Sequence, residues 1–280
     1  MRKAGRKLCT LFFALITISG ILITAYPFAA KLYNRTKALR VIDQYDKDVQ
    51  NQTLESVQKQ LDLAGQLNSY LAENGFRWEW QNEKSQAYLE AMPLEGDVCG
   101  SIEIPALHVR LPIYKGTDSS YLSLGAGHLP GTSLPIGGPS THAVITGHTG
   151  LPTARLFSDL DQLKPGDRIL IHILSQTLTY EVTGKEVVLP EQTQGMNIVE
   201  NEDLLTLVTC TPYGINSHRL LVHARRIPYE QTLETELPSA VLPYWKQVWA
   251  AAGLGLLAVL ISLALLYRRF AAQRRNKTNE

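Results

Sequence analysis

The sequence predicts a mainly β domain that follows a helical extension and lies between two apolar segments. Three observations predict this fold class: two long charge-free stretches near the ends, helical periodicity over residues 54–71, and short runs rich in β-branched residues from about residue 96 onward. We divide the 280 residues into a tail and first span (1–30), a helical extension (31–95), the β domain (96–230), a linker (231–247), a second span (248–267) and a basic tail (268–280).

The two apolar segments are long enough to cross a membrane as helices. Leu8 to Tyr26 is 19 residues without a charge and Val248 to Tyr267 is 20, which as helices span about 30 Å. Basic residues cluster before the first span and after the second. Because positive residues favour the inner side, we expect a two-pass protein of the cell membrane, with both termini cytoplasmic and the middle domain extracellular.

A cleaved signal peptide is the alternative for the first segment, because a basic start and an apolar core are typical of one. The stretch AYPFAAKLY contains no A-x-A cleavage site. We therefore favour an uncleaved signal anchor.

Overall charge and cysteine content exclude two classes of protein. The formal net charge is +1, and the basic clusters stand beside the spans, so the sequence predicts no nucleic-acid partner. Three cysteines are too few for a disulfide-stapled scaffold.

The helical extension contains an apolar stripe at three- and four-residue steps, which predicts an amphipathic helix that ends at Gly75. The stripe consists of Leu54, Val57, Leu61, Ala64, Leu67 and Leu71. In the following connector, FRWEWQ, the aromatic residues Phe76, Trp78 and Trp80 alternate with polar ones. They either pack on the main domain as a strand or loop, which we favour from the residues alone, or lie over a groove.

The β domain is predicted from eight short runs separated by turn residues, a spacing typical of one closed or partly closed all-β domain. The runs are SIEIP, HVRLPIY, HAVIT, RILIHIL, LTYEV, KEVVLP, LLTLVT and RLLVHA. One helix is expected at TARLFSDLDQL, where Leu156, Leu160 and Leu163 would share a face.

Cys210 is the candidate for chemistry, because it ends the run LLTLVT and so stands at the mouth of a strand. A cysteine attacks as its thiolate and needs a nearby cation or base. The turn at residues 212–216 can fold the next run back and place His218 or Arg219 near the sulfur. Since arginine cannot accept a proton, a third group is needed, and His148 in the loop ITGHTGLP is the best candidate.

Other roles for Cys210 remain open at this point. A buried core thiol is common for this residue type, and a disulfide with Cys99 would be permitted outside the cell. A zinc site is less favoured because no ligands have the usual short spacing. Spacing alone favours the nucleophile and the core thiol equally.

Several segments resemble the sortase family, specifically the pilin-polymerising class C sortases of Gram-positive bacteria. TLVTCTPYGINSHRLLVHARRIPY resembles the cysteine–arginine segment of that family, and ITGHTGLPTARLFSDLDQLKPGD resembles its histidine segment. GSIEIPALHVRLPIYKGT and LGAGHLPGTSLPIGG resemble its opening strands. The resemblance covers about residues 96–229 in the family's order and implies a sortase-type eight-stranded β-barrel.

The resemblance implies a cysteine transpeptidase. Cys210 would attack a carbonyl of an LPxTG-like sorting signal, cut the signal after its threonine and hold the substrate as a thioacyl-enzyme. His148 would act as general acid and base. Arg219 would bind the substrate and stabilise the oxyanion. The implied partners are pilin subunits that carry the signal, with a lysine amine of another subunit as acceptor, and the membrane. No metal or other cofactor is implied.

Two departures from class C are visible. Its members usually carry a lid with an Asp-Pro-aromatic motif, whereas this chain has no Asp-Pro and has FRWEWQ in the corresponding place. By position, Trp78 or Trp80 is the candidate for the plug, and a lid that is absent or displaced is the alternative. Thr149 follows the histidine where many relatives have arginine.

The sequence raises three alternative functions. A housekeeping-type sortase would anchor proteins to the cell wall, and a catalytically silent module would be a membrane-tethered β-barrel that only binds. A wall-anchored substrate is excluded by position, because no LPxTG-like motif stands just ahead of Val248.

Overall fold

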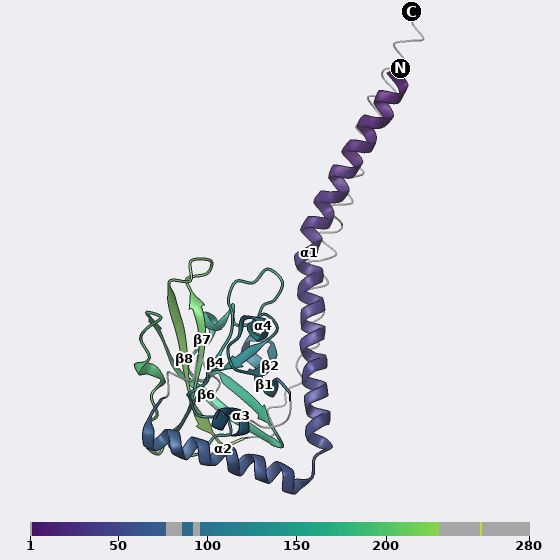
Figure 1. Ribbon diagram of the computed structural model, residues 1–280. Helices are drawn as coiled ribbons and strands as arrows, with labels where there is room; N and C mark the ends of the chain where they lie inside the picture. The colour runs from purple at the N-terminus through teal and green to yellow at the C-terminus, as the bar shows by residue number, and fades with distance from the viewer. Residues whose placement is uncertain (1, 77–85, 92–95, 230–252, 254–280) are drawn as a thin grey trace, which may run out of the picture. The chain divides into compact units, whose positions relative to one another are not determined.

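The computed structural model describes residues 2–76, 86–91, 96–229 and Gly253 (Figure 1). The chain forms two compact units, one of residues 1–30 and 236–280 and one of residues 31–235. The predicted linker, the second span at 248–267 and the basic tail lie outside the described residues, Gly253 excepted. The two-pass topology therefore stays a prediction.

The first apolar segment forms part of the long helix α1 (Arg2–Gln50), which contains Pro27. In the described part of the chain, the Ala14–Gln50 stretch of α1 is the one helix long and apolar enough to cross a membrane. Large apolar side chains such as Leu22 and Ile23 are exposed on it.

The helical extension consists of the second half of α1, α2 (Leu54–Asn74) and the short α3 (Gln86–Ala91). The predicted amphipathic helix is confirmed as α2, except that Leu54 of the predicted stripe is exposed. It begins after Thr53, whose hydroxyl accepts the backbone N–H of Ser56 at 3.1 Å, and it ends at Gly75, where φ is 76° and favours glycine. Its buried face is formed by Val57, Ala64, Leu67, Asn68 and Leu71.

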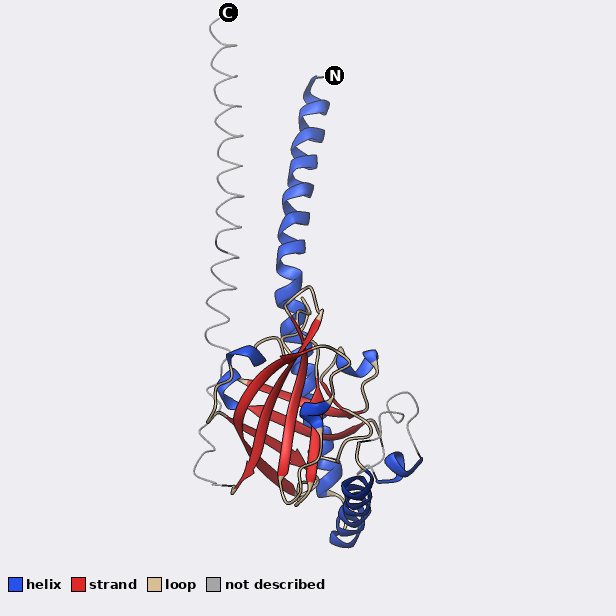
Figure 2. Ribbon diagram, turned by 90° about the vertical axis from the view of Figure 1, so that its left-hand side faces the viewer, coloured by secondary structure: helices blue, strands red, loops and turns tan. Residues whose placement is uncertain are grey.

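The barrel is closed and has eight strands, as the resemblance implied (Figure 2). Their order is β1-β2-β3-β4-β7-β8-β6-β5, and β1 pairs with β5 to close the sheet. Two neighbouring pairs, β2–β3 and β4–β7, are parallel, and the others are antiparallel. The strands are β1 (Val98–Ile104), β2 (Val109–Lys115), β3 (Ala126–His128), β4 (Thr141–Thr146), β5 (Arg168–Ile173), β6 (Gln176–Val188), β7 (Asp203–Thr211) and β8 (His218–Ile227).

Short helices occupy four of the connections between strands. They are η2 (Pro105–Leu107), α4 (Ser119–Leu122), η3 (Leu160–Gln162) and η4 (Gln194–Met196).

The helical extension is fastened to the barrel by buried hydrogen bonds. Asn68 of α2 donates to the carbonyl of Leu134 at 3.0 Å and accepts its N–H at 2.7 Å. The hydroxyl of Tyr45 in α1 donates to the carbonyl of Cys99 at 2.8 Å and accepts the N–H of Leu174 at 2.8 Å. In Figure 1, α2 accordingly runs beside the lower end of the barrel.

The helix predicted at TARLFSDLDQL is wrong. Leu156 has a φ of 37°, outside the right-handed helical region, and the backbone N–H of Phe157 bonds to the carbonyl of His148 instead of to its own segment. The three leucines are buried in the barrel core, but only η3 is helical. The leucines are therefore buried by tertiary contacts, although their segment does not form the predicted helix.

The strands around β7 have two distinct faces. Leu205 and Leu207 belong to the core inside the barrel, whereas the alternate residues Thr206, Val208 and Cys210 lie on the outer face. A second apolar cluster covers this outer face. It is formed by Val144, Met196 and Leu221, with Leu129, Val188 and Val208 packed against it.

Candidate active site

Cys210 lies near the end of β7 and is half-buried on the outer face. In the antiparallel register of β7 and β8, its direct partner is Arg219, and Thr211 pairs with His218. The sequence predicted that the intervening turn would bring one of these two residues to the sulfur, and the register confirms that placement. Residues paired in this way have Cβ atoms about 5 Å apart.

The turn between β7 and β8 is shaped by short backbone bonds. The N–H groups of Ile215 and Asn216 donate to the carbonyl of Pro212 at 3.1 and 2.9 Å. The guanidinium of Arg219 donates from one nitrogen to the carbonyls of Asn216 at 3.3 Å and His218 at 3.1 Å. Because a guanidinium has five N–H donors in a planar fork, these contacts orient Arg219 and leave donors for a further acceptor.

His148 follows β4, which runs parallel to β7 with Thr146 opposite Val208. Gly147 continues this pairing: its N–H donates to the carbonyl of Val208 at 3.0 Å, and its carbonyl accepts the hydroxyl of Thr209 at 2.8 Å. His148 is the next residue and is half-buried. The pairing of β4 with β7 places His148, just after the end of β4, on one side of Cys210. The pairing of β7 with β8 places Arg219, at the start of β8, on the other side.

The loop after His148 is held in place from three sides. A Cβ on Gly147 would lie 2.7 Å from the ring of Phe157, so only glycine lets the ring pack there. The ring of Tyr213, in the turn after Cys210, lies against Gly150, where a Cβ would be 3.3 Å away. Asn34 of α1 donates to the carbonyl of Thr153 at 3.0 Å. The histidine loop thus contacts both the cysteine turn and α1.

Cys99 and Cys210 differ sharply in burial. Cys99 of β1 is fully buried, its thiol donates to the carbonyl of Ile113 at 3.5 Å, and burial raises its pKa to about 12. Cys99 is thus a core thiol, whereas Cys210 is partly exposed. Both are free, so the disulfide alternative for Cys210 is wrong.

Two other expectations concern a bound metal ion and a lid over the active site. Within residues 2–76, 86–91 and 96–229, no group of three or more His, Cys, Asp or Glu side chains is arranged to hold a metal ion. Trp78 and Trp80, the expected plug, lie outside the described residues. Their role stays a prediction.

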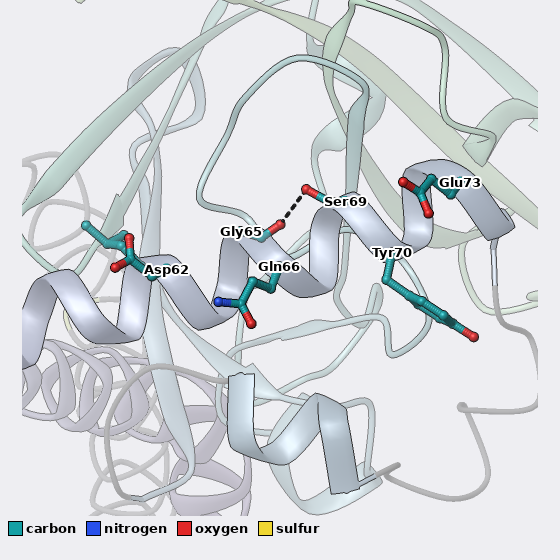
Figure 3. Close-up of a pocket in the computed structure, with 7 residues that line it drawn as sticks. Asp62, Gly65, Gln66, Ser69, Tyr70 and Glu73 are labelled. Carbon is teal, nitrogen blue, oxygen red and sulfur yellow. Dashed lines mark hydrogen bonds between the residues drawn. The ribbon is translucent and has the colours of Figure 1, made fainter.

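A hollow of about 740 Å³ lies along the exposed side of α2 and is lined by Asp62, Gln66, Tyr70 and Glu73 among others (Figure 3). The Ser69 hydroxyl there donates to the carbonyl of Gly65 at 3.0 Å, as the dashed line in Figure 3 shows. The hollow contains none of the residues of β4, β7 or β8, so it is separate from the cysteine site.

A row of polar side chains on the outer face was not predicted from the sequence. It consists of His142, Thr206, His223 and Glu186, one from each of four neighbouring strands. The sequence offered little signal for it, because His142 and His223 stand in the runs HAVIT and RLLVHA, which do not alternate apolar and polar residues.

The fold and the site together define a closed-barrel protein with a thiol site where β4 and β7 end. The chain matches the family described as "Sortase domain" over residues 102–227. The crystal structure of sortase C1 from Streptococcus agalactiae is similar with a TM-score of 0.64 and 40% identity, covering 68% of this chain and 100% of that one. Streptococcus pneumoniae sortase C has a TM-score of 0.62 and 41% identity, covering 68% of this chain and 97% of that one.

A curated relative, Sortase A of Streptococcus agalactiae serotype III (strain NEM316), is 35% identical over 130 residues, which are 45% of this chain and 52% of that protein. The match thus spans about half of that relative's length. The chain belongs to the sortase family of cysteine transpeptidases, and its structural neighbours are class C sortases.

Proposed function

We propose that this chain is a membrane-anchored class C sortase that joins pilin subunits through LPxTG-like sorting signals. The single observation that carries the proposal is the pairing of Cys210 with Arg219, with the His148 loop bonded to the same end of β7. Similarity to Streptococcus pneumoniae sortase C, whose structure is described in terms of pilin substrate specificity, supports the substrate class.

In the first half-reaction, the thiolate of Cys210 attacks the carbonyl carbon of the threonine in the sorting signal. The C–N bond to the following residue breaks, and His148 as general acid gives a proton to the leaving amine. The product is a thioester between Cys210 and the threonine. In the tetrahedral state the negative charge on oxygen lies beside the Arg219 guanidinium, which stabilises it.

In the second half-reaction, a lysine amine of another subunit attacks the thioester. His148 now accepts a proton from that amine, the C–S bond breaks, and Cys210 leaves as thiolate. The new bond is an isopeptide bond between two subunits. The acid and base steps balance, so the enzyme returns to its starting protonation state after each transfer.

The outer apolar cluster supports binding of the apolar part of the signal. Val208 is two residues from Cys210 on the same face of β7, and Leu129, Val188 and Val208 are partly buried around the cluster. Partly exposed apolar side chains next to a nucleophile are suited to a Leu-Pro segment, because contact removes apolar area from water on both sides.

The test is transfer of a fluorescent LPxTG-like peptide to a lysine-containing pilin fragment by the full chain in detergent. We expect Cys210→Ala to abolish both the isopeptide product and the thioacyl adduct seen by intact mass. Cys99→Ala is the matched control and should retain both. If Cys210→Ala kept either activity, the mechanism would be refuted. Transfer to a wall-peptide amine but not to the pilin lysine would favour the housekeeping alternative.

The membrane arrangement is part of the same proposal. We propose that α1 is an uncleaved signal anchor, that residues 248–267 form a second span, and that the barrel lies outside the cell. The apolar exposed surface of α1 supports the first span. The test is labelling of single introduced cysteines by an impermeant reagent in intact cells. Labelling at Ser175 in the barrel, and none at either terminus, is expected; a labelled C-terminus would refute the two-pass arrangement.

A further inference from the structure

Four side chains from four neighbouring strands form a continuous row on the outer face of the barrel. His142 Nε2 lies 2.7 Å from the hydroxyl of Thr206, and that hydroxyl lies 2.9 Å from His223 Nδ1. His223 Nε2 lies 3.2 Å from Glu186 Oε1. At the other end, His142 Nδ1 lies 2.7 Å from the carbonyl oxygen of Asn197. The row is therefore anchored at both ends by acceptors.

The direction of each hydrogen bond in the row follows from what each group can donate. The Asn197 carbonyl only accepts, so His142 Nδ1 carries a proton, and the neutral ring offers Nε2 as an acceptor to the Thr206 hydroxyl. The Thr206 oxygen is then free to accept from His223 Nδ1. An ionised Glu186 also only accepts, so His223 Nε2 must donate as well. The reverse order, in which a charged His142 donates to Thr206 and Thr206 donates to a neutral His223, would also complete the row, so the row requires one neutral and one positively charged imidazole, and we assign the neutral one to His142.

The surroundings of His142 agree with this assignment. Burial lowers the pKa of His142, the bond to Asn197 opposes that shift, and the nearby His223 lowers the pKa further. The other charged groups facing the two rings are Glu186 on β6 and Arg225, two residues along β8 and itself paired with Glu202 at 3.0 Å. The segment above the rings contributes no charge there, since Gln194, Gly195 and Asn197 line that side.

The row fastens the segment between β6 and β7, residues 189–202, onto the barrel. Gly195 lies directly on its charged end: a Cβ there would be 2.3 Å from Glu186 Oε1 and 3.3 Å from His223 Cε1. Asn197 is bonded to His142, as above. A cavity of about 240 Å³ lies between the segment and the strands, so packing beneath the segment is incomplete. Around this cavity the bond between His142 and Asn197 therefore contributes to holding the segment on the barrel.

The same segment reaches the surface beside the nucleophile. Met196 is buried against Val144 and Leu221, and Val208 packs on that cluster. Thr206, Val208 and Cys210 alternate along the outer face of β7, so Thr206 stands about 13 Å from Cys210. Displacing the segment would move Met196 and expose the apolar surface that adjoins Cys210.

We propose that His142, Thr206, His223 and Glu186 are positioning residues that hold segment 189–202 as the wall of the substrate surface beside Cys210. The proposal rests on the proposed transpeptidase function for its effect on substrate, but the fastening itself does not. Since the complete row needs one neutral and one charged imidazole, the wall is fixed only over an intermediate pH range, and the binding of the sorting signal is strongest there.

The test compares Thr206→Val, which keeps the shape and removes the hydroxyl, with Thr177→Val, which removes a hydroxyl bonded to His172 at 3.1 Å on the β5–β6 pair. In Thr206→Val we expect faster amide exchange at residues 193–199 and a KM for the sorting peptide about tenfold higher, with kcat within about twofold of the unchanged enzyme. Thr206→Ser should restore both values. The pH dependence of KM should flatten in Thr206→Val only.

Imidazole nitrogen NMR of the full chain in detergent tests the proton assignment directly. At neutral pH we expect His142 to be neutral with its proton on Nδ1. The proposal is overturned if His142 Nδ1 carries no proton, or if Thr206→Val matches Thr177→Val in exchange and KM. Absence of peptide transfer by the unchanged chain would refute the proposed function alone, because exchange and NMR do not depend on transfer.

Discussion

Acid should weaken the fold through one buried histidine, His128 of β3. Its side chain is fully buried, its Nε2 lies 2.9 Å from the carbonyl of Ser133, and its Nδ1 lies 3.0 Å from the hydroxyl of Tyr88 in α3. Because the carbonyl only accepts, Nε2 carries the single proton and Nδ1 accepts from Tyr88. Burial lowers the pKa of His128 from 6.5 to about 4, and the bond to Ser133 opposes that shift.

The sign and size of the effect follow from this depressed pKa. Above about pH 6.5 the imidazole is neutral in both folded and unfolded chains, so it adds no pH dependence. Below that pH the unfolded chain binds a proton that the folded chain takes up only near pH 4, and the free energy of unfolding falls. A difference of about 2.5 pKa units corresponds to a loss of about 3 kcal/mol between pH 6.5 and 4.

The assay is urea unfolding of the full chain in detergent at several pH values from 7 to 4, with His128→Gln as the comparison. The variant starts less stable, but it cannot titrate at this position, so its stability should fall less over the same range. The remaining fall includes His142, whose pKa burial also lowers. Equal slopes for the unchanged chain and for His128→Gln would refute the reasoning.

Three further predictions concern the helical extension. Asn68→Ala removes both bonds to the backbone of Leu134 and should lower the free energy of unfolding by about 2–4 kcal/mol. The control Asn74→Ala removes an amide that bonds within α2 and should lower it by less than about 1 kcal/mol. Equal losses for the two variants in urea unfolding would contradict this prediction. Tyr45→Phe leaves the N–H of Leu174 and the carbonyl of Cys99 without their partner and should cost about 1–3 kcal/mol by the same measurement, and a neutral result would argue against that anchor. Replacing Trp78 and Trp80 with alanine should speed alkylation of Cys210, and an unchanged rate would show that they do not cover it.

Strand pairing explains what the sequence predicts about the barrel and what it misses. The runs LTYEV and KEVVLP look separate because Gly184 interrupts them, yet they form the single strand β6 with a shift in register between Val182 and Gly184. The short β3 is not among the runs predicted from the residues, since Ala126–His128 lacks the usual β-formers, and only the resemblance of LGAGHLPGTSLPIGG covers it. A Cβ on Gly127 would lie 2.3 Å from the carbonyl of Gly116, so close backbone approach selects glycine there.

The candidate site shows the same division between local and distant contacts. Arg219 was predictable from residues alone, because a turn of a few residues separates it from Cys210 and sets the register. His148 is distant in sequence, and its place depends on the parallel pairing of β4 with β7, which propensity does not reveal. Its position in a glycine-flanked loop made His148 the best candidate from the residues, and the resemblance then implied its role beside Cys210. The row through Thr206 needs four strands in their final order, so no local pattern predicts it.

Side chains of β7 point alternately into the barrel and outward, which separates the residues that affect stability from those that affect the site. Leu205 and Leu207 fill the interior while Thr206 and Cys210 face outward, so the thiol and the residues that shape its surroundings share one strand but no core contacts. A substitution that leaves a cavity in the core should mainly lower the free energy of unfolding. A substitution at an outward position should mainly change substrate binding or the rate of the chemical step. The expected separation is testable with Leu207→Ala, which should lower the unfolding free energy by about 2–5 kcal/mol while the folded fraction retains its KM, in contrast to Thr206→Val.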